Sequence, residues 1–468
     1  MLTYDLNARD KMPLYEYLYS RIKADIRSGV LKRDYKLPSK RSLAQHLKVS
    51  VITVENAYAQ LALEGYIYSL EKKGYYVGEP EIVQIGSEPT IYNAIEREAT
   101  EDHSLIDFRS NSVNHQKFPF SIWAKLMREV LSERQEYLLR RIPNKGVYEL
   151  RLAIAKHLRD FRGIHIQPEQ VIIGSGTEYL YGMLVKLLGQ DKKFALENPG
   201  YKKIGQIYSS SGVEYAPVNI DREGLSVKDL ERSGASIVHI SPTHNFPTGI
   251  VMSSKRRREI LEWAAKDSTR YIIEDDYDSE LRFQGNPLLS LQSIDQQQKV
   301  IYMNTFTKTL APSIRISYML LPPSLLDLYE QKLGFYACTV PSFEQYALAK
   351  FIANGYFERH IYRMRKFYKA QRNLLIKTIK NSKLQKKVQI IEHSAGLHFL
   401  LKISTALSDS AITAAAREKG LLISCLSEHC IAPSGLCKPS ILVINYSGVD
   451  SSQILTGIKY LEEIICSH

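Results

Sequence analysis

The chain has 468 residues, of which 44% are hydrophobic and 24% charged, so we expect a globular protein of two or three domains rather than a disordered or fibrous one. It has no apolar run long enough to span a bilayer, and residues 1–5 do not begin a signal peptide. Five cysteines, an odd number in a large chain, predict reduced thiols and a cytoplasmic location. Cys425, Cys430 and Cys437 lie near His429 without a C-x-x-C pair, which favours ordinary thiols over a metal site.

The net charge of +12 is spread unevenly, and the front of the chain is several times more basic per residue than the rest. Residues 1–78 hold 13 Lys/Arg and 8 Asp/Glu, an excess of five, whereas the other 390 residues carry an excess of seven. A basic segment is compatible with nucleic-acid binding, but it is often only a solvated surface. Charge alone therefore identifies no partner.

Three helices and a hairpin are predicted in residues 1–78. Apolar residues recur every four positions over 13–26, and Ser39 and Ser50 are expected to cap two further helices that end near residues 47 and 64. Alternating strands are expected on both sides of the basic turn 71–74. This order is that of a winged helix-turn-helix, whose second paired helix enters the major groove. The alternative is a small helical cap that binds nothing; charge, capping and hairpin together favour the DNA-binding interpretation.

The pattern Leu37-Pro38-Ser39-x-Arg41-x-Leu43-Ala44, then Ser50-x-x-Thr53-Val54-x-x-Ala57-Tyr58-x-x-Leu61-x-x-x-Gly65, resembles the GntR family over residues 11–78. The resemblance implies binding to double-stranded operator DNA. The DNA-binding residues that it suggests are Ser39, Lys40, Arg41, Ser50, Val51, Thr53, Lys72, Lys73 and Gly74. Val51 stands where the family often has Arg, so we expect an apolar contact with a thymine methyl group there rather than guanine recognition.

Residues 79–105 are predicted to form a linker between domains 1–78 and 106–468. They are acidic and polar, contain two prolines, and show a helical pattern only around 91–99. From residue 106 onward helical and strand patterns alternate, which predicts a doubly wound α/β fold. Long basic amphipathic helices and short strands follow from about residue 345.

Two segments of the large domain carry groups that suit one cofactor. In 271–280 an apolar strand ends in carboxylates and a tyrosine, at the place where α/β folds bind ligands. Lys308 lies among hydroxyl-bearing and apolar residues, where desolvation lowers the pKa of an amine and makes it a candidate Schiff-base former. Candidate phosphate-binding residues are Thr305, Thr307 and Arg315, together with Gly176 and Thr177 at a Gly-rich turn that begins a helix. A solvated lysine or an acidic loop would explain single residues, but pyridoxal phosphate (PLP) needs lysine, carboxylate and phenol together.

This combination resembles the fold-type I aminotransferases, which have a large doubly wound subdomain and a smaller C-terminal one. The resemblance implies that Lys308 bonds to the cofactor aldehyde and Asp275 faces the pyridine nitrogen. It also implies that Tyr277 faces the ring hydroxyl, Arg315 the phosphate and Tyr201 the ring face.

The loop 241–249 resembles the family's N-P-T-G loop, with Phe246 at the usual Asn position. His244 or Asn245 is therefore expected to supply the polar contact to the ring oxygen, although an ordinary loop histidine is equally compatible with the sequence. The Phe246–Pro247 bond is a candidate cis peptide.

A GntR-type domain joined to an aminotransferase-like domain is the arrangement of the MocR/GabR regulators, which this chain resembles over most of its length. The resemblance implies a head-to-tail homodimer whose operator affinity is set by PLP and a small effector, which is PLP itself, an amino acid or an amine. The alternative is an active aminotransferase with an N-terminal appendage.

The sequence favours the regulator over the enzyme at one position, so no residue is assigned as catalytic. Aminotransferases hold the substrate carboxylate with an Arg on a late strand, and Val443 stands there in this chain. Losing that contact costs about 1.5–3 kcal/mol of binding. Lys202, Lys203 or Arg141 could replace it.

Overall fold

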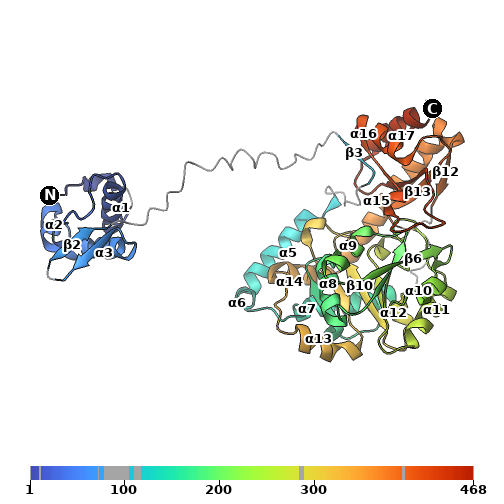
Figure 1. Cartoon of the computed structure of the whole chain (residues 1–468), viewed down its shortest axis with the longest axis horizontal. Coiled ribbons are helices and arrows are strands. Elements are labelled where there is room, and N and C mark those ends of the chain that lie inside the picture. The colour runs from blue at the N-terminus through green and yellow to red at the C-terminus, as the bar shows by residue number, and fades with distance from the viewer. Residues whose placement is uncertain are drawn as a thin grey trace. The chain divides into compact units, whose positions relative to one another are not determined.

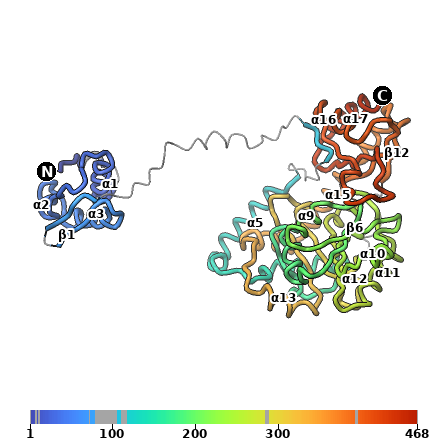
Figure 2. The backbone as a smooth tube through the Cα atoms, viewed as in Figure 1, coloured from blue at the N-terminus to red at the C-terminus, as the bar shows by residue number. Residues whose placement is uncertain are grey.

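The computed structural model describes residues 2–9, 12–71, 73–78, 105–109, 117–283, 289–392 and 396–466. The chain divides into two compact units, Met1–Glu101 and Asp102–His468 (Figures 1 and 2). The expected linker 79–105 lies almost wholly outside the described residues, as does Lys72. The domain boundaries given above stay predictions. Within the described ranges, no helix is long and apolar enough to cross a membrane.

The first unit has the expected order of three helices and a hairpin. Its elements are a short 3-10 helix η1 (Leu6–Arg9), α1 (Leu14–Arg27), α2 (Lys40–Leu47), α3 (Val51–Leu63), β1 (Ile67–Leu70) and β2 (Gly74–Val77). Both predicted caps form, because the Ser39 and Ser50 hydroxyl oxygens accept hydrogen bonds of 3.1 Å from the backbone N–H groups of Ser42 and Thr53. The apolar faces of the three helices pack into one core that includes Leu18, Leu43 and Tyr58.

The second unit contains the expected doubly wound sheet. Its strands are β4 (Val171–Gly174), β5 (Phe194–Asn198), β6 (Tyr215–Asp221), β7 (Gly224–Leu225), β8 (Ile237–Ile240), β9 (Tyr271–Asp275), β10 (Val300–Thr305) and β11 (Ser317–Leu320). Their spatial order is β4-β11-β10-β9-β8-β5-β6-β7. The central strands from β10 to β6 are parallel, whereas β11 and β7 run antiparallel to their neighbours.

Helices cover both faces of this sheet, which explains why its central strands are apolar throughout (Figure 1). One face packs against α8 (Thr177–Leu188), α9 (Lys202–Ser210) and α13 (Leu326–Leu333). The opposite face packs against α5 (Phe120–Glu133), α7 (Tyr148–Arg162), α10 (Val227–Ser233), α11 (Ser254–Ala265), α12 (Leu291–Ile294) and α14 (Ser342–Ala353). A short helix α6 (Gln135–Leu138) follows α5.

A smaller subdomain closes the second unit. Its antiparallel sheet has the order β12 (Val388–Ile391), β13 (His398–Ile403), β16 (Ile441–Asn445), β15 (Ser424–Cys425). It packs with α15 (Tyr356–Lys380), α16 (Asp409–Glu418) and α17 (Ser451–Cys466). The early strand β3 (Ile106–Asp107) pairs with β14 (Leu421–Leu422), so the start of this unit lies beside its end.

The cysteines depart from the sequence-based expectation. Cys430 and Cys437 form a disulfide, with their Cα atoms 6.1 Å apart, so the prediction of reduced thiols is wrong for this pair. The loop between them turns back on itself, as the hydrogen bond from Cys437 N–H to the Ser434 carbonyl shows. Spacing alone does not reveal such a turn. Cys338, Cys425 and Cys466 are free thiols.

Candidate functional site

A cavity of about 420 Å³ lies at the carboxyl ends of β5, β8, β9 and β10, the edge at which open α/β sheets bind ligands. All the residues expected to bind PLP line it except Gly176 and Asn245. The lining members are Thr177, Tyr201, Asp275, Tyr277, Thr305, Thr307, Lys308 and Arg315. Residues far apart in the chain therefore meet at one edge because their strands are neighbours.

Lys308 follows β10 and reaches the cavity wall. Burial lowers the pKa of its amine to about 8, against a weaker opposing effect of the Asp278 carboxylate. A larger fraction of this amine is therefore neutral near pH 7 than of an exposed lysine, and the neutral form is the nucleophile.

Asp275 ends β9 and is 5% exposed. Its Oδ2 accepts a hydrogen bond of 2.6 Å from the Tyr181 hydroxyl and lies 3.5 Å from His239 Nε2. Its Oδ1 is buried without a hydrogen-bond partner in the part of the chain that the structure describes. A buried carboxylate oxygen without a partner is costly unless a ligand supplies a donor.

Tyr277 lines the cavity, but its hydroxyl donates to the backbone oxygen of His244 at 3.1 Å. The His244 ring in turn lies 2.8 Å from an Asp278 oxygen. Burial raises the pKa of the Tyr277 phenol well above its ordinary value, so this group stays protonated as a donor. The Phe246–Pro247 peptide is cis, as the sequence suggested.

Asn245 is buried away from the cavity wall, where its amide oxygen accepts a hydrogen bond of 2.6 Å from the Thr248 hydroxyl.

Arg315 and Thr177, the first residue of α8, line one part of the cavity, which we call the phosphate recess. The Arg315 guanidinium donates to the Ser175 carbonyl at 3.4 Å, and Gly176 adopts a φ of +95° directly before the helix. A Cβ atom on Gly176 would collide with that guanidinium. The positive φ favours glycine here, and any larger residue would also push the Arg315 guanidinium aside. The free N–H groups of the first turn of α8 and the cation together suit an anion.

The hydroxyl groups of Thr305, Thr307 and Ser317 form a chain of hydrogen bonds near Lys308. Thr305 Oγ1 donates to Thr307 Oγ1 and accepts from Ser317 Oγ, both at 2.8 Å. Thr305 also accepts the Thr307 backbone N–H at 3.1 Å. The threonines thus hold the backbone that carries Lys308.

The far wall of the cavity contains residues that sequence reasoning missed. Arg109 reaches it because β3 pairs with β14, Ile431 lies in the loop closed by the disulfide, and His429 directly precedes that loop. Burial and then the charge of Lys202 lower the pKa of His429 to about 4, so its ring is neutral at pH 7. The Phe246 ring stands nearly perpendicular to it, 5.1 Å between centroids. No sequence signal joins these residues, because each arrives through a long-range contact.

Val443 is buried in an apolar cluster with Leu400, Leu426 and Ile441, and Phe246 packs against this cluster. The position at which the sequence resemblance placed the carboxylate-binding arginine of aminotransferases is thus apolar in this chain. None of the suggested replacements lines the cavity. Lys203 forms an ion pair with Glu178, and the Arg141 guanidinium donates to the Phe335 carbonyl at 3.5 Å.

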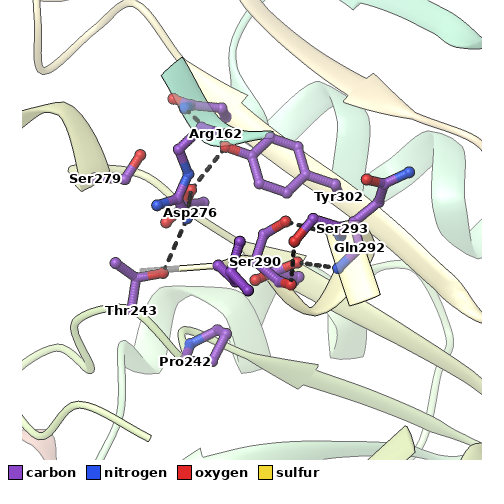
Figure 3. A network of polar contacts seen from close by, with 12 residues as sticks. Arg162, Pro242, Thr243, Asp276, Ser279, Ser290, Gln292, Ser293 and Tyr302 are labelled. Atoms are coloured by element: carbon purple, nitrogen blue, oxygen red, sulfur yellow. Dashed lines mark hydrogen bonds and ion pairs between the residues drawn. The ribbon is translucent and has the colours of Figure 1, made fainter. Parts of the chain in front are cut away.

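A buried ion pair supports the turn that follows β9 (Figure 3). Arg162 and Asp276 lie 2.7 Å apart with side chains no more than 1% exposed, and the Tyr302 hydroxyl donates to the same Asp276 oxygen at 2.7 Å. Arg162 also contacts the Thr243 hydroxyl at 3.4 Å. Burial lowers the pKa of the Arg162 guanidinium, but the nearby acidic groups, Asp276 first among them, together outweigh burial and raise this pKa. Because Asp276 points into this network, Asp275 and Tyr277 on either side face the cavity.

The residues suggested for DNA binding lie around α2, α3 and the hairpin of the first unit. Arg41, Ser50, Val51, Lys73 and Gly74 are exposed. The hydroxyl groups of Ser39 and Ser50 are engaged in capping.

Lys40 differs from the others, because its amine pairs with Glu55 at 2.6 Å and lies over the Tyr75 ring. It therefore joins α2 to α3 and to the hairpin.

Comparisons with known proteins match both units. The family described as aminotransferase class I and II matches residues 104–461, and the bacterial regulatory proteins of the gntR family match residues 14–77. The uncharacterized HTH-type transcriptional regulator YdeL of Bacillus subtilis is 36% identical over 457 residues, which cover 98% of each chain. The probable rhizopine catabolism regulatory protein MocR of Rhizobium meliloti is 32% identical over 478 residues, covering 98% of this chain and 95% of that one.

A third regulator and a solved structure are also similar to this chain. The HTH-type pyridoxine biosynthesis transcriptional regulator PdxR of Corynebacterium glutamicum is 27% identical over 91% of this chain and 90% of its own. Among solved structures, the kynurenine aminotransferase of Pyrococcus horikoshii superposes with a TM-score of 0.69 at 24% identity. It covers 83% of this chain and 98% of its own, which shows the shared fold.

Proposed function

Since the chain belongs to the MocR-type transcriptional regulators, in which a gntR-family domain is joined to an aminotransferase class I and II domain, we propose how its two units act. The first binds operator DNA through its winged helix-turn-helix. The second senses PLP, or a small amine or amino acid that meets PLP, in the cavity at the end of the sheet. One observation carries the proposal. Lys308, Asp275 and Arg315 line the same cavity, in a chain that also has a gntR-family domain.

PLP is the cofactor of this aminotransferase family, and the residues of the cavity fit it. The Asp275 oxygen without a partner suits a protonated ring nitrogen, and the recess at Gly176 and Arg315 suits a phosphate. Bound PLP supplies an aldehyde that a neutral amine can attack.

The chain's own side chains have the following roles in this proposal. Lys308 provides the amine, whose lowered pKa favours covalent attachment. Arg315 and the first turn of α8 hold the phosphate, with Thr305 and Thr307 supporting the recess. Tyr201, whose ring stands perpendicular to that of Phe246 at 5.9 Å, borders the ring of the cofactor.

The apolar cluster at Val443 supports a sensor rather than a working aminotransferase. An enzyme must orient its substrate carboxylate while bonds change, and misplacement is costly for the rate. A sensor needs only ligand binding that favours one arrangement of the chain over another. We therefore propose that ligand occupancy changes the operator affinity of the first unit, in a cytoplasmic head-to-tail homodimer.

The test compares wild type with Lys308→Ala and, as a control, with Lys266→Ala, which replaces an exposed lysine that pairs with Glu231. Lys308→Ala should lose the visible absorption of the bound cofactor, the borohydride-stable adduct seen by mass spectrometry, and the PLP-dependent change in operator affinity. Lys266→Ala should keep all three. An unaltered PLP response in Lys308→Ala would contradict the proposal. Sustained release of keto acids from a panel of amino acids would favour an enzyme.

A further inference from the structure

One face of α3 is exposed along its length and carries an unusual set of side chains. Val54, Ala57, Tyr58 and Leu61 face the core, whereas Val51, Ile52, Glu55, Asn56 and Ala59 face away from it. Val51 is 41% and Ile52 67% exposed. Single exposed apolar residues are ordinary on a protein surface. Here two adjacent ones occupy the first turn of the helix that a helix-turn-helix inserts into the major groove.

The same face has no cationic side chain, since its five residues include no Lys or Arg. It therefore lacks the groups that most often recognise guanine, which bind its O6 and N7 atoms. Its one charged residue is Glu55, and Lys40 holds that carboxylate at 2.6 Å while lying over the Tyr75 ring of the hairpin. Glu55 is thus engaged within the domain rather than available to accept from cytosine. Apolar groups and the Asn56 amide remain to contact bases.

The nearby cationic side chains belong to other segments of the same domain. Arg41 in the first turn of α2, Lys48 in the turn before α3 and Lys73 in the hairpin are all exposed. Such residues suit phosphates, which position a domain on DNA without selecting a sequence. An exposed apolar pair on α3, together with exposed cations on α2, the turn and the hairpin, suits the floor of a major groove between two phosphate backbones.

We propose that α3 selects A·T pairs, with Val51 and Ile52 packed against the 5-methyl groups of thymines and Asn56 hydrogen-bonded to an adenine. This inference rests on the DNA-binding function proposed above and deepens it by naming the base chemistry. Asn pairs with the N6 and N7 atoms of adenine in the major groove, and thymine alone presents a methyl group there. Each operator half-site should therefore contain adjacent A·T pairs where α3 docks.

The first experiment selects binding sites from a randomised duplex DNA library with the full-length protein. We expect enriched half-sites that share A·T pairs at fixed positions. In the second experiment each thymine of the selected site is replaced by deoxyuridine, which removes only the methyl group. Wild-type affinity, measured by fluorescence anisotropy at one salt concentration, should fall about fourfold at each contacted thymine, as expected for one buried methyl group.

The variants Val51→Ala and Ile52→Ala link each methyl group to its side chain. In each variant, deoxyuridine at one thymine should no longer change the affinity, while the effect at the other thymine stays. Leu63→Ala is the matched control, because Leu63 is 88% exposed at the opposite end of the same helix. It should retain both deoxyuridine effects.

The outcomes separate this inference from the function on which it rests. Selected sites with G·C pairs under α3, or deoxyuridine effects that persist in both alanine variants, would overturn A·T recognition and leave DNA binding intact. A library from which no sequence is enriched would overturn the DNA-binding function itself. If Val51→Ala and Ile52→Ala instead change the oligomeric state by light scattering and leave DNA affinity unchanged, the exposed pair is a protein contact and the inference fails.

Discussion

At the scale of single residues, the chemistry of the cavity depends on how much water each group has lost. Lys308 and His429 both have lowered pKa values because burial disfavours their charged forms. Burial shifts the pKa in the opposite direction for Glu197, a carboxylic acid that lines the same cavity, and raises it to about 7. The cavity therefore holds fewer charges at neutral pH than its composition suggests, which strengthens the influence of Asp275 and Arg315.

The pH dependence of cofactor attachment tests this view of Lys308. The neutral amine reacts, so the initial rate at which apoprotein and PLP develop visible absorption should rise with pH through about 8 and then level off. The Asp278 carboxylate raises the pKa of this lysine, so Asp278→Asn should move the midpoint to lower pH. Stopped-flow absorbance across a pH series measures both. A midpoint near the ordinary lysine value of 10.5 would contradict the expected burial.

At the scale of elements, the junction of β4 and α8 builds the phosphate recess. A strand, a tight turn and a helix start place backbone N–H groups beside Arg315, and Gly176 keeps the space that its guanidinium occupies. The helix also contains Gly182, whose Cβ would meet nothing within 4 Å. A side chain at position 176 would thus disturb Arg315, whereas position 182 has space for one.

This contrast supplies a matched pair of variants. Gly176→Ala should displace Arg315 and weaken PLP binding roughly tenfold to a hundredfold, the cost of a charge-assisted contact of about 1.5–3 kcal/mol. Gly182→Ala should leave PLP affinity unchanged and stabilise the helix by up to about 1 kcal/mol. Absorbance titration and chemical denaturation measure the two effects. Equal PLP affinity in both variants would show that the recess does not hold the phosphate.

At the scale of the whole molecule, each unit has its own apolar core, so each can be studied as a separate fragment. Regulation requires that the two be coupled in the intact chain. Coupling between two binding equilibria is reciprocal, so operator DNA must change PLP affinity by the factor with which PLP changes operator affinity.

We predict that in the full-length protein PLP changes operator affinity by the same factor by which operator DNA changes PLP affinity. A mixture of fragments 1–101 and 102–468 should show no such coupling. The fragments should still bind DNA and PLP separately, because each retains the residues of its own site. Anisotropy with labelled operator and absorbance titration of PLP measure the two factors. Coupling that persists in the mixture would mean that the chain between the units is not needed to transmit the signal.

The sequence by itself determined the features that depend on neighbours in the chain. Helix periods, the caps Ser39 and Ser50, the strand before Asp275 and the Gly-rich turn at Gly176 are local patterns, and each lies where its motif indicated. The alternation of helical and strand patterns from residue 106 onward also indicated the doubly wound sheet. Local rules of backbone geometry and hydrogen bonding act before any distant contact forms.

Only the tertiary structure decided which distant residues share the cavity. Arg109 reaches it through the pairing of β3 with β14, and Ile431 through a loop closed by a disulfide that spacing did not suggest. The tertiary structure also decided that Asn245 accepts a hydrogen bond from Thr248 and that Lys40 forms an ion pair with Glu55. These outcomes depend on strand order and on competition among several partners for each polar group. The pattern of residues along the sequence shows neither the strand order nor this competition, because packing brings those partners together only once the chain has folded.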